Sequence, residues 1–275
     1  MKQALPFWHV DAFADRAFAG NPAAVVVADA PLPEDLMQAV AAEMNLSETA
    51  FVERRAGQNP LLRWFTVVRE IDLCGHATLA TAHVWLTALE PGAQRVVFDT
   101  LHAGPLPVER GAHGYTMDLP ARQPEPLALS AIPGFVLPAL SPARPVEAHA
   151  AGEKALLVYA DPASVRAMRP DFLALRPWTR RIIVTAPSDD PSYAFISRHF
   201  NANDPAAPED PVCGSAHCAL APYWAARLGK TAFRAWQASA RGGALDLALA
   251  GARVRMGGPA VTVARGELYP NARAG

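Results

Sequence analysis

The sequence lacks the features that mark several large classes of protein. Its 275 residues include only three cysteines, too few and too unevenly placed for a disulfide framework. The net charge is -1 and no basic stretch is longer than a pair, which argues against nucleic acid as a partner. No apolar run approaches the roughly 18 residues that a membrane-spanning helix needs. We therefore expect a soluble, cytoplasmic protein that binds neither nucleic acid nor membrane.

The motifs of common cofactors are also missing. There is no glycine-rich phosphate loop, and Gly242-Gly243 lacks the spacing of a dinucleotide fingerprint. Cys213 and His217 are four residues apart, which would suit zinc, but no Cys-x-x-Cys or His-Glu-x-x-His element accompanies them. We therefore predict no cofactor and no metal.

What the sequence does contain is an internal repeat. Residues 70–85 align without gaps onto residues 209–224, and Glu, Cys, Gly, three Ala and Trp coincide. The likeness continues upstream, between residues 63–65 and 198–200. A unit repeated at about half the chain length predicts two similar domains. We place them at residues 1–118 and 119–275, allowing for a last strand that crosses back to the first domain.

Each copy of the repeat predicts a strand, a polar turn and then a Cys-Gly step into a helix. The helical residues are rich in Ala and Leu and apolar on nearly every face, which predicts buried helices. A buried helix that begins at Cys74-Gly75 or Cys213-Gly214 directs unpaired backbone N–H groups at whatever lies before it, and that end favours carboxylates and thiolates. The surrounding strands and helices predict an α+β architecture with mixed, largely antiparallel sheets.

The two matched cysteines are candidates for proton transfer. A thiol at a helix N-terminus has its thiolate form favoured. If Cys74 and Cys213 approach one cleft from opposite domains, one could remove a proton from a carbon and the other return one to the opposite face, as in a racemase or epimerase. The alternative is that both are small buried core residues, which a repeat would preserve equally well.

Two acids and a histidine are further candidates. Asp210 stands three residues before Cys213 in a Glu-Asp-Pro turn, and Glu48 precedes an apolar strand. A partly desolvated carboxyl group is a good proton shuttle near neutral pH, although a surface charge or a helix cap would explain either acid as well. His76 follows Gly75 at the entrance of the first helix, where it could contact a ligand.

The order of motifs along essentially the whole chain resembles the PhzF family of phenazine-biosynthesis-like isomerases, which have the diaminopimelate epimerase fold. The motifs that carry this resemblance are Val10-Asp11-Ala12-Phe13, Gly20-Asn21-Pro22, Met44-Asn45-Leu46-Ser47-Glu48-Thr49, Cys74-Gly75-His76-Ala77-Thr78, Glu209-Asp210-Pro211, Gly214-Ser215-Ala216 and Arg241-Gly242-Gly243.

The resemblance implies two pseudo-symmetric domains, each a curved sheet around a central buried helix, with the active site between them. It also implies cofactor-free isomerisation of a small carboxylate substrate, as in the conversion of trans-2,3-dihydro-3-hydroxyanthranilate, and commonly a homodimer. By the family motifs, Glu48 would be the proton shuttle. The other expected site residues are His76, Asp210 and Ser215 around the substrate, and Gly75 and Gly214, whose amides would hold its carboxylate.

This sequence departs from the family pattern in a way that leaves three functions open. Many PhzF-like sequences have Thr at the position of Cys213, whereas the related diaminopimelate epimerases and proline racemases use a thiol pair at the positions of Cys74 and Cys213. The sequence has His76, however, where those epimerases have Asn. We expect an isomerase that uses Glu48, with a two-thiol racemase as the first alternative and a non-catalytic ligand-binding protein of the same fold as the second.

Overall fold

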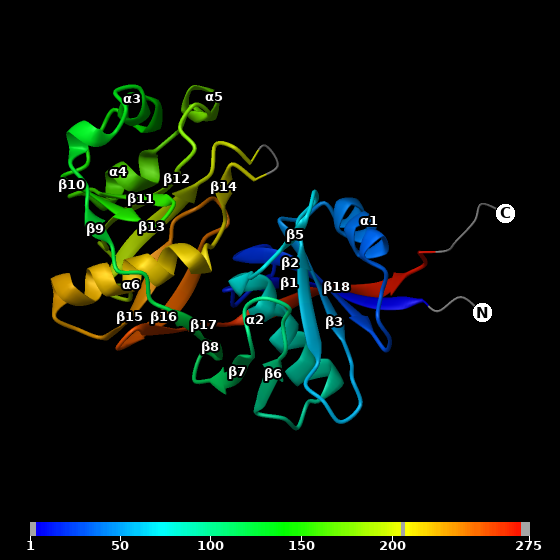
Figure 1. Cartoon of the computed structure of the whole chain (residues 1–275). Helices are drawn as coiled ribbons and strands as arrows, with labels where there is room; N and C mark the ends of the chain where they lie inside the picture. The colour runs from blue at the N-terminus through cyan, green and yellow to red at the C-terminus, as the bar shows by residue number, and fades with distance from the viewer. Residues whose placement is uncertain (1–3, 205–206, 271–275) are drawn as a thin grey trace. The chain divides into compact units, whose positions relative to one another are not determined.

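The computed structural model describes residues 4–204 and 207–270 (Figure 1). Its contacts divide the chain into two compact units. Unit 1 combines the residues up to Asp118 with those from Gly257 onward, and unit 2 is Leu119–Met256. The outermost residues of the two expected domains, 1–3 and 271–275, lie outside the described residues. Among those described, no helix is long and apolar enough to cross a membrane.

Unit 1 is built on a six-stranded sheet in the order β18-β1-β2-β3-β4-β5, in which only β2 and β3 pair in parallel. The last strand, drawn in red, pairs with the first, drawn in blue (Figure 1). The strands of this sheet are β1 (Leu5–Ala12), β2 (Asn21–Ala28), β3 (Glu48–Glu53), β4 (Leu61–Phe65), β5 (Glu70–Ile71) and β18 (Ala260–Leu268). The other elements are α1 (Glu34–Met44), α2 (Gly75–Val84), a π-helical turn (Trp85–Leu89), β6 (Arg95–Phe98), β7 (Leu106–Gly111) and β8 (Gly114–Pro120), which ends just past the unit boundary.

Unit 2 has a sheet in the order β16-β15-β13-β12-β11-β10-β9, with β14 paired to β13. It is mixed, because β11–β12 and β13–β15 are parallel and the other pairs among these strands are antiparallel. Its strands are β9 (Glu125–Pro126), β10 (Glu147–Ala151), β11 (Lys154–Val158), β12 (Arg181–Pro187), β13 (Phe195–Phe200), β14 (Glu209–Asp210), β15 (Ala232–Gln237), β16 (Gly243–Ala250) and β17 (Arg253–Gly258), which crosses the second boundary. Its helices are a 3-10 turn (Leu129–Ala131), α3 (Val136–Leu140), α4 (Pro162–Ala167), α5 (Phe172–Leu175) and α6 (Gly214–Leu228).

This architecture confirms the predicted α+β class with mixed, largely antiparallel sheets. Each unit has one long helix that is buried on nearly every face, α2 in unit 1 and α6 in unit 2. The sequence did not predict α3 or α5. Helices this short are not stable alone, because the first turn is costly to form. Val136, Leu137 and Leu140 of α3 belong to the buried core of unit 2, so packing holds that helix in place.

The internal repeat corresponds to a repeated supersecondary structure. In unit 1, β4 pairs antiparallel with β5, and α2 follows; in unit 2, β13 pairs antiparallel with β14, and α6 follows. Each copy also carries a bidentate ion pair across its two strands, with both contacts at 2.6 Å for Arg63–Glu70 and at 2.7 and 2.9 Å for Arg198–Glu209. The coinciding Arg and Glu of the two copies therefore fasten the strand pair that precedes each buried helix.

Pro222 lies inside α6 without ending the helix. A proline has no N–H to give to the carbonyl four residues earlier, which is that of Cys218. The backbone N–H of Arg122 donates to this carbonyl instead, at 2.9 Å. The segment that enters unit 2 therefore satisfies the acceptor that the proline leaves without its intrahelical partner.

Gly20 fixes the start of β2. Its φ is +64°, in the left-handed region, and an added Cβ would lie 2.2 Å from the carbonyl oxygen of Ala12. Both the backbone conformation and the available space therefore require glycine here. The next residue, Asn21, begins β2 and is completely buried.

Candidate active site

Strands β2 and β3 and helix α2 of unit 1 begin close together. β2 and β3 are parallel, with Ala23 opposite Glu48. Asn21 and Glu48, the first residues of these strands, therefore lie at the same end of the sheet. Helix α2 packs on both strands and begins directly after Cys74, its N-cap residue. Strand pairing and helix packing thus bring together Asn21, Glu48, Cys74 and His76, which are far apart in the sequence.

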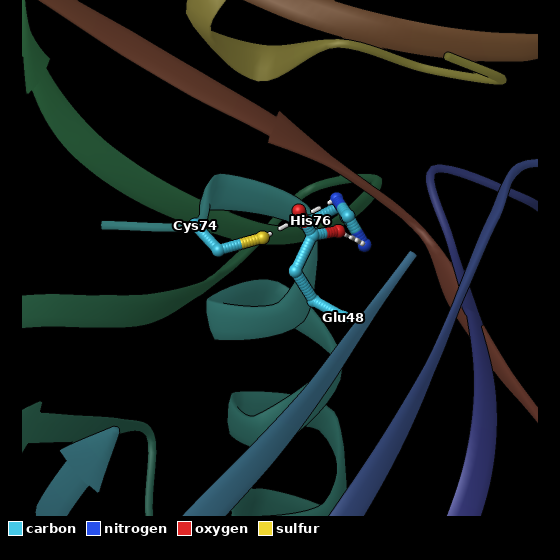
Figure 2. A group of neighbouring side chains, drawn as sticks. All are labelled: Glu48, Cys74 and His76. Atoms are coloured by element: carbon cyan, nitrogen blue, oxygen red, sulfur yellow. Dashed lines mark hydrogen bonds and ion pairs between the residues drawn. The ribbon is translucent and has the colours of Figure 1, made fainter. Parts of the chain in front are cut away.

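Glu48 and His76 are the central pair of this cluster (Figure 2). Oε2 of Glu48 lies 3.3 Å from Nε2 of His76, and the two side chains are 18% and 6% exposed. Burial lowers the pKa of His76 to about 3, so the imidazole is neutral near pH 7. The amide nitrogen of Asn21 lies 3.1 Å from Nδ1 of His76 and donates to it. This contact leaves the ring proton on Nε2, where it faces the Glu48 carboxylate.

Cys74 is the third labelled member of this cluster (Figure 2). Its Sγ lies 3.5 Å from Nδ1 of the imidazole, and the residue is buried. The first helical residue after it is Gly75, whose amide belongs to the turn of α2 that has no intrahelical acceptors. An anionic group placed here would meet positive partial charge from the helix and a carboxylate able to accept a proton.

The tautomer of His76 can be measured directly. Long-range proton–nitrogen NMR of the protein should show a neutral ring protonated on Nε2 that does not titrate between pH 8 and 5, because the folded-state pKa is about 3. In concentrated urea the same ring should titrate near 6.5, the value of an unburied histidine. A ring that becomes doubly protonated above pH 5 in the folded protein would show that burial does not hold it neutral.

Unit 2 holds a second polar cluster, which also lies at the start of the buried helix of its unit. His199 of β13 is paired with Asp210 of β14, and Cys213 is the N-cap residue of α6. Nδ1 of His199 lies 3.8 Å from Oδ2 of Asp210. Burial is the largest cause that raises the pKa of Asp210 well above its usual value, and the Cys213 thiol adds to it. Burial also lowers the pKa of His199 to about 4.

The residues around Cys213 explain one position at which the two copies of the repeat differ. Sγ of Cys213 lies 3.3 Å from Oγ of Ser215, which is exposed. Nδ1 of His217 lies 2.8 Å from the Cys213 carbonyl, and its Nε2 lies 3.3 Å from Oγ of Ser197. In unit 1 the hydroxyl of Thr78, at the position equivalent to His217, donates to the Cys74 carbonyl at 2.6 Å. His217 therefore contacts the carbonyl of the N-cap residue of α6, as Thr78 contacts that of α2.

Gln237 fixes the turn between Asp210 and Cys213. Its side chain is completely buried, its Oε1 accepts from the backbone N–H of Cys213 at 2.8 Å, and its Nε2 donates to the carbonyl of Asp210 at 2.6 Å. One amide group thereby sets the distance between the acid and the thiol, which belong to different elements.

The candidate site residues that the sequence indicated lie in two groups, one in each unit. Unit 1 brings together Glu48, Cys74, Gly75 and His76, and unit 2 brings together Asp210, Cys213, Gly214 and Ser215. No local pattern in the sequence singles out Asn21, His199 or Gln237 as site residues. Gly20-Asn21-Pro22 was noted only among the motifs of the resemblance, and His199 only as part of the repeated range 198–200.

A mixed sheet packed on a buried helix is a fold that the chain shares with epimerase-like α+β proteins, among them a predicted epimerase of Pseudomonas aeruginosa that is 22% identical, over 96% of this chain and 99% of its own, with a TM-score of 0.68. The family model described as phenazine biosynthesis-like protein, PhzC-PhzF, matches residues 10–266. The chain belongs to this family, which confirms the resemblance seen in the sequence.

Individual relatives agree with this assignment. The chain is 44% identical to an uncharacterized isomerase of Pseudomonas aeruginosa, over 96% of this chain and 98% of the relative. A crystal structure of a PhzF-family protein from Enterococcus faecalis is 43% identical, covers 97% of this chain and all of its own, and superposes with a TM-score of 0.90. A hydroxyproline epimerase from Agrobacterium vitis, solved with bound trans-4-hydroxy-L-proline, is 12% identical over 98% of this chain and 94% of its own, with a TM-score of 0.57. This last likeness shows the shared fold alone.

Proposed function

We propose that the protein is a cofactor-independent isomerase that moves a proton within a small carboxylate substrate, with Glu48 as the proton shuttle. The observation that carries the proposal is the contact between the Glu48 carboxylate and the neutral, buried His76 at the N-terminus of α2. The Glu48 carboxylate is negatively charged and only partly solvated, so it can act as a base. The neutral His76 beside it can donate a hydrogen bond without adding a charge.

In the proposed reaction, Glu48 accepts a proton from one carbon of the substrate and becomes a neutral carboxylic acid. The electron pair of the broken C–H bond is delocalised into the substrate. Glu48 then returns the proton to another carbon and recovers its charge, so no oxidant, reductant or cofactor is consumed. The N–H groups at the start of α2, that of Gly75 among them, would hold the substrate carboxylate.

If both helix starts serve one substrate, as the sequence predicts, the unit 2 cluster would supply a second acid and further binding groups. Burial and the neighbouring thiol raise the pKa of the Asp210 carboxyl well above its usual value, which favours a role as a proton donor. Ser215 and the amide of Gly214 would contribute polar contacts from the start of α6. The prediction from the sequence that both helix starts serve one substrate stays a prediction.

A two-thiol racemase is the second candidate. It is favoured by the equivalent positions of Cys74 and Cys213, each an N-cap residue with Sγ within 3.5 Å of a polar side-chain atom. In this reaction one thiolate removes the proton at Cα and the other thiol supplies a proton to the opposite face.

The two candidates can be separated with single variants. The wild-type protein, Cys74→Ser and Cys213→Ser would each be incubated with amino acids, hydroxyprolines and dihydro-3-hydroxyanthranilate, and turnover would be followed by NMR and polarimetry. For a shift catalysed by Glu48, both serine variants should keep activity within about tenfold of wild type, because general acid–base catalysis worth 10²–10⁴-fold would remain. A loss of 10³-fold or more in both would contradict the proposal and favour the racemase. Turnover of no compound in the panel would favour the non-catalytic alternative.

A further inference from the structure

Strand pairing in unit 2 places a histidine beside the Asp210 carboxyl. His199 of β13 and Asp210 of β14 are cross-strand partners, and Nδ1 of the imidazole lies 3.8 Å from Oδ2 of the carboxyl. This distance is about 1 Å longer than an ordinary N–H···O hydrogen bond, and the hydrogen bonds of a catalytic site often tighten only around the substrate. A small movement of the Asp210 side chain would therefore bring the two groups into hydrogen-bond contact.

The internal repeat indicates that this histidine and this acid belong together. The cross-strand pair His199–Asp210 corresponds to Trp64–Ile71 of unit 1, in the same register before the buried helix. The neighbouring Arg–Glu ion pair, by contrast, is the same in both copies. Both members of one pair thus differ between the copies, and only unit 2 combines a carboxyl group with a side chain that can donate to it.

The ring of His199 is available as a donor. The residue is only 3% exposed, and among the described residues neither of its ring nitrogens has a hydrogen-bond partner. Buried polar groups without a partner are rare in natural proteins, and each one calls for an explanation. A hydrogen bond that forms only during the reaction would explain why the ring is retained here.

The surroundings of His199 keep its ring neutral. Burial is the main cause that lowers the pKa of His199 to about 4. The charged groups that act on it come from the neighbouring strands and one turn: Lys154, Arg181, Glu153 and Asp210. The two cations lower the pKa further and the two acids oppose them, while His217 of α6 is also neutral, with a pKa lowered by burial to about 4. His199 can therefore donate an N–H to a carboxylate without adding a positive charge.

The other contacts of Asp210 act on its proton in both directions. Burial and the Cys213 thiol favour the protonated acid, whereas the backbone N–H of Val212 and the His199 ring favour the carboxylate. The side chain is 29% exposed, so it is open to solvent on one side. An acid balanced in this way can both give a proton and take it back.

We propose that His199 is a positioning residue for Asp210, and that its Nδ1–H donates to the Asp210 carboxylate once Asp210 has given its proton to the substrate. The inference rests on the proposed function, in which Asp210 supplies a second acid. When Glu48 accepts a proton from carbon, the O–H bond of Asp210 breaks and its electron pair stays on the carboxylate. The proton bonds to the substrate oxygen onto which the electron pair of the C–H bond is delocalised. It returns to Asp210 when Glu48 gives its proton back, and His199 keeps its own proton throughout.

NMR of protein labelled with ¹³C at the aspartate carboxyl groups tests the contact without an activity assay. The Asp210 signal, assigned by its loss in Asp210→Asn, would be titrated in the wild type and in His199→Phe, which keeps a ring but has no N–H. We expect the pKa of Asp210 to rise by about one pH unit or more in His199→Phe, because the carboxylate loses a donor. In His199→Asn it should stay within about half a pH unit of wild type, since the amide nitrogen can donate from the place of Nδ1.

Turnover supplies the second measurement. On a substrate identified with the panel above, His199→Phe should lower kcat for solvent deuterium incorporation by about 10- to 100-fold, the effect of one hydrogen bond to a charged group. KM should stay within about threefold of wild type, because the hydrogen bond forms only after the proton has moved. His199→Asn should restore most of the lost rate, which a purely structural role of the ring would not predict.

The control is a histidine on the same row of side chains. His149 pairs with Leu156, Leu156 with Ile183 and Ile183 with His199 across successive strands, so His149 lies three strands away. His149→Phe should leave both kcat and the titration of Asp210 as in the wild type.

The outcomes separate this inference from the proposed function. An unchanged titration of Asp210 in His199→Phe, or an equal shift in His149→Phe, would overturn the inference alone. An Asp210→Asn variant with wild-type kcat would contradict the acid role of Asp210 in the proposed function, whatever the titration shows. If His199→Phe does not fold, as judged by circular dichroism, His199→Leu takes its place with the same expected shift.

Discussion

Glu48→Gln should lower the rate of proton transfer by about 10³-fold or more, because the amide keeps the shape of the side chain but cannot accept a proton from carbon. The rate of Glu48→Asp should lie between those of Glu48→Gln and the wild type, at roughly a 10²-fold loss, because aspartate keeps the carboxylate but holds it about one bond length further back. The measurement is the initial rate of solvent deuterium incorporation into the substrate, at saturating substrate, for each purified variant.

The control for this experiment lies on the same strand. Glu53→Gln removes a carboxylate from the other end of β3, and it should leave the rate within about twofold of wild type. Equal losses in the Glu48 and Glu53 variants would indicate a general effect of charge or folding. A Glu48→Gln variant with wild-type activity would exclude Glu48 as the proton shuttle.

Arg198→Met should destabilise the protein by about 3 kcal/mol. The Arg198 side chain is only 8% exposed, and it forms a bidentate pair with Glu209, which is 22% exposed. It also donates to the carbonyls of Val165 and Met168 at 3.1 and 2.9 Å, at the end of α4. Its removal leaves a largely buried carboxylate and two backbone acceptors without their donor, and breaking such a pair costs about 3–5 kcal/mol when fully buried.

Arg63→Met is the matched variant in unit 1. Arg63 is 17% exposed, and of its two acidic partners Glu70 is 22% exposed and Glu34 is 71% exposed. Water can therefore solvate more of what the substitution leaves behind, and we expect a loss of only about 1 kcal/mol. Urea denaturation followed by circular dichroism would measure both changes in the free energy of unfolding. Equal losses in the two variants would show that the helix-end carbonyls bonded to Arg198 add nothing.

The sequence was most informative where the repeat preserved both chemistry and packing. The matching Cys-Gly steps predicted where α2 and α6 begin, and both helices are buried as their apolar faces indicated. The largely antiparallel sheets followed from short strands separated by turns. These features depend on local patterns, which a single sequence displays directly.

The missed residues depend on contacts between distant segments. Asn21 and His76 are 55 residues apart, and Gln237 reaches the Cys213 amide across 24 residues, so no local spacing reveals either contact. Strand pairing likewise brings His199 and Asp210 beside the Cys213 thiol, although the three residues belong to different elements. The repeat did contain a signal, because a Trp in one copy corresponds to a His in the other.

The most direct test of the proposed isomerisation is the position of deuterium in the product. The wild-type protein would be incubated in heavy water with each compound of the panel, and the product would be examined by proton NMR. Transfer by Glu48 predicts deuterium at a carbon two bonds from the one that loses its proton. Deuterium at Cα of an otherwise unchanged substrate, with loss of optical purity, would contradict this account and indicate that Cys74 and Cys213 exchange the proton.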